Sequence, residues 1–257
     1  MSVTLQDIRD GFLALGVQPG ATLLMHSSLS RFGHVLGGAD AVIDGILEAI
    51  GPEGTLVTPA LTGGPELSPK NPPHIDLRTQ SCWVGRIPET LRQRTDAIRS
   101  THPTHSCSAL GKRALEMTRN HHLSATPCGI PSPYFHVAAA GGKIVLAGCG
   151  LECCTTLHTV EELANVSYHL QPGIAYGWCI DIHGNQVDTP CRLHSYDGPE
   201  RDFPVLEPIL LEKNLMRIGH VGASTVRIID AMGLIENGLN HIRFDPFFLT
   251  VLRRKNR

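Results

Sequence analysis

The chain has no long apolar run, few aromatic residues and almost no net charge. None of its apolar stretches approaches the roughly twenty residues of a membrane-spanning helix, and its N-terminus lacks a basic segment followed by an apolar one. A formal charge of −2 gives no general attraction to nucleic acid or to an anionic membrane. We therefore expect a cytoplasmic protein that binds neither nucleic acid nor membranes.

The cysteines lack the spacing of a disulfide framework. There are eight, including the adjacent pair Cys153 and Cys154, but no Cys-x-x-Cys motif, so we expect reduced, mostly buried thiols. Hydrophobic residues make up 42% of the chain and charged residues 18%, which is typical of a globular protein. A length of 257 residues fits a single α/β domain, 1–257, of unknown oligomeric state.

Strand and helix patterns alternate in the first half of the chain. Residues 21–30 have the pattern of a buried strand, 39–51 that of a helix and 54–61 that of a second strand. This order predicts a β-α-β crossover, and residues 143–148 predict another buried strand. The predicted fold class is α/β, with a central, mostly parallel sheet flanked by helices and an additional C-terminal α+β part.

Other segments have weaker patterns. Residues 62–81 are rich in Gly, Pro and Ser, which predicts a long loop that binds a ligand. Residues 177–191 predict a hairpin that turns at 183–185. Residues 221–238 predict a strand or a helix, and 245–257 predict a last strand that ends in a basic cluster.

His158 follows the predicted strand 143–148 and precedes Glu161 and Glu162. Residues three and four apart share a helix face, so either carboxylate can reach the imidazole. A carboxylate that orients a histidine leaves its other nitrogen free to act as a general base. The alternative is a solvated helix face with chance charges. Ligands of open α/β sheets gather at the carboxyl ends of strands, which favours a functional histidine.

The loop after the first strand has features of an anion-binding site. Its glycines allow close backbone approach, and the next helix presents free N–H groups at its N-terminus. It matches neither the dinucleotide motif nor the Walker loop, and a simple tight turn remains the alternative. The residues concerned are Ser27, Ser28, Ser30, Arg31, Gly33, Gly37 and Gly38.

Two other chemistries are possible. His102, His105 and Cys107 are ligand types that zinc uses, although Pro103 breaks any helical face between them and a buried polar loop explains them equally well. Cysteines near His158 could carry an acyl group. These candidates are Cys149, Cys153 and Cys154.

Six stretches have the order and spacing of one known family. They are HSSLSRFGHVLGGADAVIDGILEAIGPEGTLVTPA, GRIPETLRQRTDAIRSTHPTHSCSALG, PSPYFHVAAAGGKIVLAGCG, TTLHTVEELA, RDFPVLEPIL and RIGHVGASTVRIIDA. Over nearly the whole chain, this order resembles the aminoglycoside 3-N-acetyltransferase family. The resemblance implies an antibiotic-resistance enzyme that transfers acetyl from acetyl-CoA, without a metal, to the 3-amino group of the 2-deoxystreptamine ring of an aminoglycoside.

The resemblance also implies roles for individual residues. The family's Leu-His-x-x-Glu motif falls on Leu157, His158 and Glu161, which makes His158 the general base and Glu161 its orienting partner. Apart from the resemblance, attack on a thioester gives an oxyanion that needs positioned donors, and we expect the hydroxyl of Thr156 or of its neighbour Thr155, or nearby backbone N–H groups, to supply them. Coenzyme A is expected to bind Ser27, Ser28, Leu29, Ser30, Arg31, Gly33, Val35, Gly37 and Gly38, with His102 and Ser106 lining the same cleft.

A polycationic substrate requires acidic residues, and we expect these to be Glu89, Glu162, Asp197 and Asp202. The chain departs from the family pattern at Cys154, where Asn is frequent, and at 61–74, which lacks the expected aromatic residue. The acceptor could therefore be another amino sugar or a biosynthetic amine. A metal-dependent hydrolase and a non-catalytic coenzyme A or sugar-binding protein also remain as alternatives.

Overall fold

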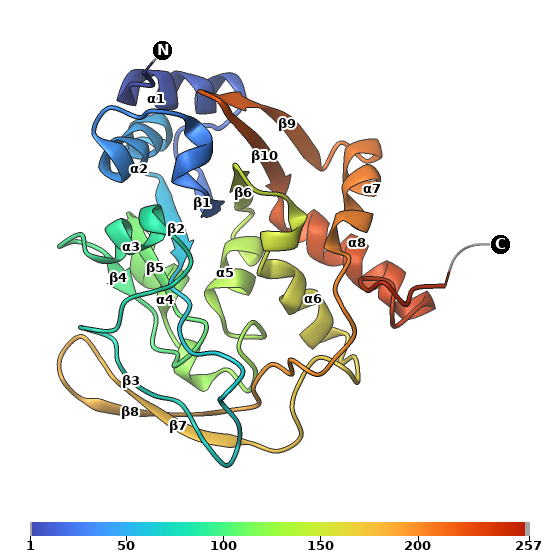
Figure 1. Ribbon diagram of the computed structural model, residues 1–257. Helices are drawn as coiled ribbons and strands as arrows, with labels where there is room; N and C mark the ends of the chain where they lie inside the picture. Colours follow the sequence, from blue (N-terminus) through green and yellow to red (C-terminus); the bar gives the residue numbers. More distant parts are fainter. Residues whose placement is uncertain (1, 255–257) are drawn as a thin grey trace.

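A seven-stranded sheet forms the centre of the molecule (Figure 1). The computed structural model describes residues 2–254. Strand β1 pairs in parallel with β2 and β6, and the outer strands pair in antiparallel fashion. In spatial order the strands are β4 (Ile98–Arg99), β5 (Cys107–Gly111), β2 (Thr55–Pro59), β1 (Thr22–Ser27), β6 (Lys143–Ala147), β10 (Ser224–Asp230) and β9 (Met216–Val221).

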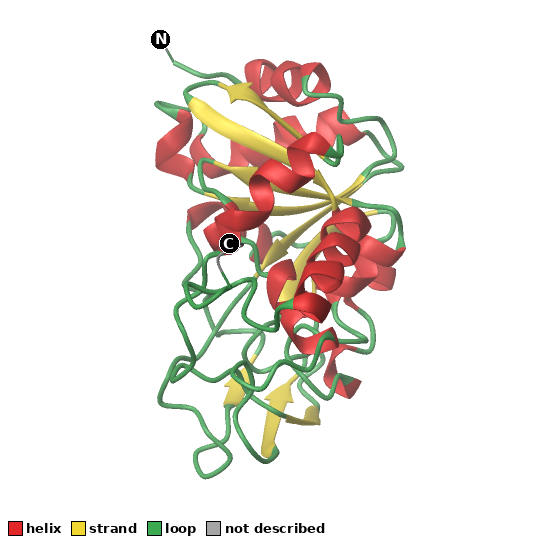
Figure 2. Ribbon diagram, turned by 90° about the vertical axis from the view of Figure 1, so that its right-hand side faces the viewer, coloured by secondary structure: helices red, strands yellow, loops and turns green. Residues whose placement is uncertain are grey.

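Helices cover both faces of this sheet (Figure 2). Successive strand residues point to opposite faces, so Leu23 joins the core beneath α1, α2 and α3, whereas Leu24 joins the core beneath α4 to α8. The helices are α1 (Leu5–Ala14), α2 (Gly38–Ile50), α3 (Arg86–Arg92), α4 (Ala114–Thr118), α5 (Pro133–Ala139), α6 (Thr156–Leu163), α7 (Glu207–Glu212) and α8 (Ala231–Phe244), with 3₁₀ turns η1 (Leu29–Phe32), η2 (His121–Leu123), η3 (Leu151–Cys153) and η4 (Phe203–Leu206).

Local sequence sets the beginning of two N-terminal helices. Thr4 Oγ1 accepts a hydrogen bond from Asp7 N at 3.2 Å, and Asp7 Oδ2 accepts one from Thr4 N at 2.8 Å. This capping box fixes the first turn of α1. Gly37 precedes α2 with a φ of 85°, a left-handed conformation that glycine adopts without steric cost.

The predicted α/β fold and its β-α-β crossover are confirmed. Strand β1, helix α2 and strand β2 follow one another, and Thr22 pairs in parallel register with Thr55. Parallel pairing is limited to the three central strands of the mixed sheet. The carboxyl ends of β1 and β6 therefore lie side by side.

A second, three-stranded sheet lies at the bottom of Figure 1. It contains β3 (His74–Asp76), β7 (Ala175–Ile180) and β8 (Gln186–Cys191). The predicted hairpin is confirmed as β7 and β8, and Asp181 Oδ1 accepts a hydrogen bond from Asn185 N at 2.8 Å in its turn. The loop predicted at 62–81 includes β3, which pairs with β7.

The C-terminal part differs from the prediction at its end. Residues 221–238 contain both β10 and the start of α8. The strand predicted from residue 245 onward is wrong for 245–254, where Pro246 has no N–H to donate and Phe248 N donates to Asp245 O in a turn at 2.9 Å. Residues 255–257 of that predicted strand lie outside the described residues.

Two general expectations can be compared with the structure. Across residues 2–254, no helix has both the length and the apolar character needed to cross a membrane. All eight cysteines are free thiols, and six of them are buried. The prediction that most thiols are buried is therefore confirmed.

Candidate active site

The candidate site lies where β1 and β6 end. Their parallel pairing brings Ser27 opposite Ala147, and Ser28 N donates a hydrogen bond to Ala147 O at 2.9 Å. The chain continues from β1 into η1 and from β6 through η3 into α6. Two loops that are distant in sequence therefore meet beside the first turn of α6.

His158 and Glu161 form the central hydrogen bond of the site. His158 Nδ1 lies 2.7 Å from Glu161 Oε2, at the three-residue spacing of one helix face. The Glu161 side chain is fully buried, and Arg201 Nε donates to its Oε1 at 3.1 Å. The carboxylate is thus paired with a cation and held against the imidazole.

Arg201 indicates which histidine donates its proton to Glu161. His169 Nδ1 also lies 3.1 Å from Glu161 Oε2, but Arg201 Nη2, which can only donate, lies 3.0 Å from the same nitrogen. His169 Nδ1 must therefore accept, and burial lowers the pKa of His169 far below its usual range. The proton shared with Glu161 therefore belongs to His158 Nδ1, which leaves Nε2 as the nitrogen of this ring that can accept a further proton.

The rings around His158 are uncharged at neutral pH. His158 stacks on His169 at a centroid distance of 5.0 Å and lies 4.9 Å from His194. Burial also lowers the pKa of His105 and of His194 well below the usual range. A proton gained by His158 would therefore be balanced chiefly by the neighbouring Glu161 carboxylate.

Glu162 faces away from His158. Its oxygens accept hydrogen bonds from Cys128 N at 2.9 and 3.0 Å, and its Oε1 lies 2.7 Å from His194 Nε2. Burial raises the pKa of Glu162 to about 8, and its side chain is only 1% exposed. It is neither a second partner of His158 nor a group that a substrate can contact directly.

Two cavities share a wall that contains His158. The first, of about 1000 Å³, extends along the loop after β1, and the second, of about 410 Å³, extends along the loop after β8. Residues that line both cavities are Leu61, Trp83, Glu152, Thr155, His158 and Phe203. A group in either cavity can therefore approach the same imidazole.

Most of the expected cofactor residues line the first cavity. Ser27 Oγ is buried there and has no hydrogen-bond partner within residues 2–254, and the same holds for His26 Nε2. Two of the glycines have positive φ angles, 86° at Gly33 and 62° at Gly38. The expected residues that line this cavity are Ser27, Ser28, Leu29, Ser30, Gly33, Val35 and Gly38.

Four expected cofactor residues lie outside the cavity lining. Arg31 and Gly37 belong to the same loop but do not face the cavity. His102 and Ser106 are buried: His102 Nδ1 accepts from His105 N at 3.0 Å, and Ser106 Oγ accepts from Arg99 Nε at 3.0 Å. These two side chains stabilise the turn before β5 instead of facing a ligand.

Several lining residues were not predicted from the sequence. Trp83 is 64% exposed, lines both cavities and donates from Nε1 to Gly63 O at 3.2 Å. It follows the loop predicted at 62–81 by two residues, and its exposure could not be inferred from that composition. Arg86 and His26 also line the first cavity. His26 was not predicted because it lies within an apolar strand pattern.

The acids expected to bind substrate lie outside the second cavity. Glu89 binds Arg92 through two hydrogen bonds of 2.8 and 2.5 Å, and the guanidinium lowers the pKa of Glu89 to about 2. Asp202 pairs with Arg253, and Asp197 is exposed beside the lining. The carboxylates that line the second cavity are those of Glu152 and Glu200.

The two threonines at the start of α6 occupy different environments. Thr156 is fully buried and outside both cavities, and its Oγ1 has no hydrogen-bond partner within residues 2–254. Thr155 lines both cavities. Thr155 is therefore the hydroxyl that a reacting group can approach.

Three cysteines line the first cavity but differ in acidity. Burial raises the pKa of Cys154 to about 12, whereas a hydrogen bond from Cys149 lowers the pKa of the exposed Cys153 to about 7. Cys153 is thus the thiol of this group that ionises most readily near neutral pH.

The ligand set considered for zinc, His102, His105 and Cys107, does not form a cluster within residues 2–254. Two other groups of three ligand-type side chains do. One is His158, His169 and His194, and the other is His105, Cys128 and His194.

Comparison with known proteins identifies related chains. A family model described as aminoglycoside 3-N-acetyltransferase matches residues 24–242. Aminoglycoside N(3)-acetyltransferase VIII of Streptomyces fradiae is 30% identical over 89% of this chain and 88% of its own length. The crystal structure of aminoglycoside acetyltransferase AAC(3)-Xa is 30% identical, with a TM-score of 0.82 over 97% of this chain and 94% of that one. AAC-IIIb in binary complex with CoASH, 24% identical, shares the fold with a TM-score of 0.79 over 95% and 97% of the chains.

Proposed function

Because the chain belongs to the aminoglycoside 3-N-acetyltransferase family, we propose that it transfers the acetyl group of acetyl-CoA to the 3-amino group of the 2-deoxystreptamine ring of an aminoglycoside. The observation that carries this proposal is the position of His158 in the wall shared by two cavities. One cavity holds the acyl donor and the other holds the amine. We further propose a cytoplasmic location, where acetyl-CoA is present.

The first cavity suits coenzyme A. The unpartnered Ser27 Oγ offers a hydrogen bond within the cavity. Gly33 and Gly38, which have positive φ angles, carry no side chain, so a ligand can approach the backbone of this loop closely. Arg86 contributes a positive charge to the same lining, which suits a phosphate. Acetyl-CoA bound here supplies the thioester carbonyl that the amine attacks.

His158 acts as the general base. The amine of an aminoglycoside is largely protonated near neutral pH, so it must lose a proton before or during its attack on the thioester. That first proton is released to solvent. As the free amine attacks the thioester carbon and the C–N bond forms, Nε2 of His158 takes the second proton from the nitrogen, while Glu161, 2.7 Å from Nδ1, stabilises the positive ring. The imidazolium then returns a proton to the departing sulfur, so that His158 ends the cycle neutral.

Thr155 stabilises the oxygen that becomes negative during attack. Its hydroxyl borders both cavities at the beginning of α6, and a positioned donor aimed at a developing oxyanion lowers the barrier. Glu200 and Glu152 attract the other ammonium groups of the acceptor in the second cavity. The proposed reaction requires no metal.

The proposal is tested by measuring release of the free thiol of coenzyme A with a panel of amines. We expect release with 2-deoxystreptamine aminoglycosides, and mass spectrometry should locate the acetyl group on the 3-amino nitrogen. His158→Ala should lower kcat by about 10²–10⁴-fold, the usual contribution of general-base catalysis, with an unchanged Kd for acetyl-CoA. Full turnover in His158→Ala, or no release with any aminoglycoside, would contradict the proposal.

A further inference from the structure

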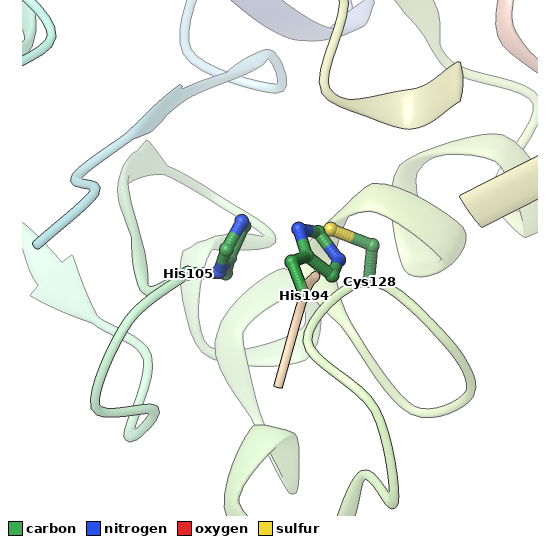
Figure 3. Close-up of side chains that lie close together, drawn as sticks. All are labelled: His105, Cys128 and His194. Atoms are coloured by element: carbon green, nitrogen blue, oxygen red, sulfur yellow. The ribbon is translucent and has the colours of Figure 1, made fainter. Parts of the chain in front are cut away.

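We propose that His105, Cys128 and His194 form a binding site for a divalent cation of the zinc type (Figure 3). One ligand atom from each side chain lies within 4.8 Å of the other two. Imidazole nitrogen and cysteine sulfur are the donors that Zn²⁺ prefers, and three protein ligands with one open position are a common arrangement for this ion. The site goes beyond the acetyl transfer proposed above and does not depend on it.

The three ligands come from segments that are distant in the sequence. His105 lies in the turn between β4 and β5, Cys128 in the segment between η2 and α5, and His194 after β8. Figure 3 shows their side chains close together. An ion bound to all three would link the second sheet to the main sheet, and would therefore stabilise the folded state over the unfolded chain.

Each imidazole is already oriented through one ring nitrogen. Thr104 Oγ1 lies 2.9 Å from His105 Nδ1, and Glu162 Oε1 lies 2.7 Å from His194 Nε2. Within residues 2–254, the side-chain hydrogen bonds of these two rings involve only Nδ1 of His105 and Nε2 of His194. An outer hydrogen-bond partner on one nitrogen, such as the Glu162 carboxyl group beside His194, fixes the orientation of a metal-bound histidine.

Only small movements are needed to close the site. Ligand bond lengths of a tetrahedral zinc ion place its donor atoms about 3.3–3.6 Å apart. Because the three donor atoms lie within 4.8 Å of one another, no separation has to shorten by more than about 1.5 Å. Binding replaces the thiol proton of Cys128 with the cation, and that proton is released to solvent. Because His105 and His194 line the second cavity, water can occupy the fourth position.

The neighbouring group of His158, His169 and His194 is a poorer site. Nδ1 of His169 accepts from the Arg201 guanidinium at 3.0 Å, and Nδ1 of His158 is engaged by Glu161. A cation beside that guanidinium would experience charge repulsion. The group that contains Cys128 offers a sulfur ligand instead.

The test is titration of the full chain with Co²⁺, which replaces Zn²⁺ and reports its ligands by absorption. We expect one equivalent to bind, with a thiolate-to-cobalt charge-transfer band and the intense visible bands of a four-coordinate ion. Cys128→Ser should abolish the charge-transfer band. Cys153→Ser is the matched control, because Cys153 is the exposed thiol with a pKa of about 7, and it should retain the full spectrum.

Thermal unfolding gives a second readout. Zn²⁺ should raise the Tm of the wild-type chain and of Cys153→Ser, but not that of Cys128→Ser, because an ion that binds only the folded state stabilises it. His105→Asn, which retains the thiol, should bind Co²⁺ more weakly. This second variant keeps the test informative if Cys128→Ser fails to fold. Absence of the charge-transfer band in the wild type, its persistence in Cys128→Ser, or its loss in Cys153→Ser would overturn the proposal.

Discussion

The hydrogen bond between His158 Nδ1 and Glu161 determines where the proton of the imidazole lies. We expect Glu161→Gln to lower kcat by about 10²–10⁴-fold, because a neutral amide cannot balance a positive ring and its NH₂ group can displace the proton to Nε2. The Kd for acetyl-CoA should stay unchanged, because Glu161 is fully buried. Steady-state kinetics and equilibrium binding measure the two quantities.

Asp197→Asn is the control for this prediction, because Asp197 is an exposed acid outside both cavities. It should retain wild-type turnover. Wild-type kcat in Glu161→Gln would show that the carboxylate does not orient the base.

The residue scale also shows what local spacing can predict. The approach of His158 to Glu161 follows from three-residue helical spacing, and it was predicted. The same spacing rule cannot tell which of two adjacent acids faces the histidine, and Glu162 faces Cys128 and His194 instead. The contact with Arg201, forty residues further along the chain, depends on tertiary packing that no local pattern encodes.

At the scale of elements, the loop from 193 to 201 supplies the wall of the second cavity. Glu200 belongs to this loop, and we expect Glu200→Gln to raise the KM for an aminoglycoside about two- to fivefold, the effect of losing one partly exposed ion pair. The KM for acetyl-CoA should not change, and added salt should reduce the difference between variant and wild type.

Glu89→Gln provides the comparison, because Glu89 is paired with Arg92 outside the cavity linings. It should lower Tm and leave the KM for the aminoglycoside unchanged. A larger KM effect at Glu89 than at Glu200 would contradict this assignment. The ion pair of Glu89 with Arg92 could have been predicted from the sequence, because the two residues are three apart and such pairs form on one helix face.

Element order was more predictable than element contacts. The strand, helix and strand at 22–59 were predicted from apolar periodicity, and the structure confirms them as β1, α2 and β2. The antiparallel position of β10 beside β6 depends on long-range pairing. The segment at 245–254 has apolar residues typical of a strand, but its turns and Pro246 prevent one.

At the scale of the whole molecule, buried histidines make stability depend on pH. Burial lowers the pKa of His26 and of His121 to about 3, against about 6.5 in an unfolded chain. The unfolded state therefore binds more protons below pH 6.5, and each such histidine lowers the free energy of unfolding by about 1.4 kcal/mol per pH unit of acidification. The pKa values of His102, His105, His169 and His194 are lowered in the same direction.

Glu162 acts in the opposite sense. Burial raises its pKa to about 8, so its contribution to stability is complete below about pH 4.3 and is lost as pH rises towards 8. On acidification, Glu162 therefore offsets the loss in free energy of unfolding that about one buried histidine causes. Urea unfolding measured at about pH 7.5, 6.5 and 5.5 should therefore show that the free energy of unfolding falls steeply between pH 6.5 and 5.5.

His121→Asn tests this account away from the cavities. Its imidazole bonds Ser100 Oγ and Pro127 O, and an amide in its place cannot gain a proton on unfolding. We expect the slope of stability against pH to decrease by about 1.4 kcal/mol per pH unit below pH 6. A flat stability profile in the wild-type chain between pH 7.5 and 5.5 would refute the account.

The two cavities share one wall but draw on different loops. The stretch 193–201 contributes only to the second, and the stretch 27–38 contributes only to the first. Mutations can thus accumulate in one compartment while the chemistry of the other is conserved. Acceptor preference can then diversify among descendants of such a chain with the donor and the proton-transfer step inherited intact.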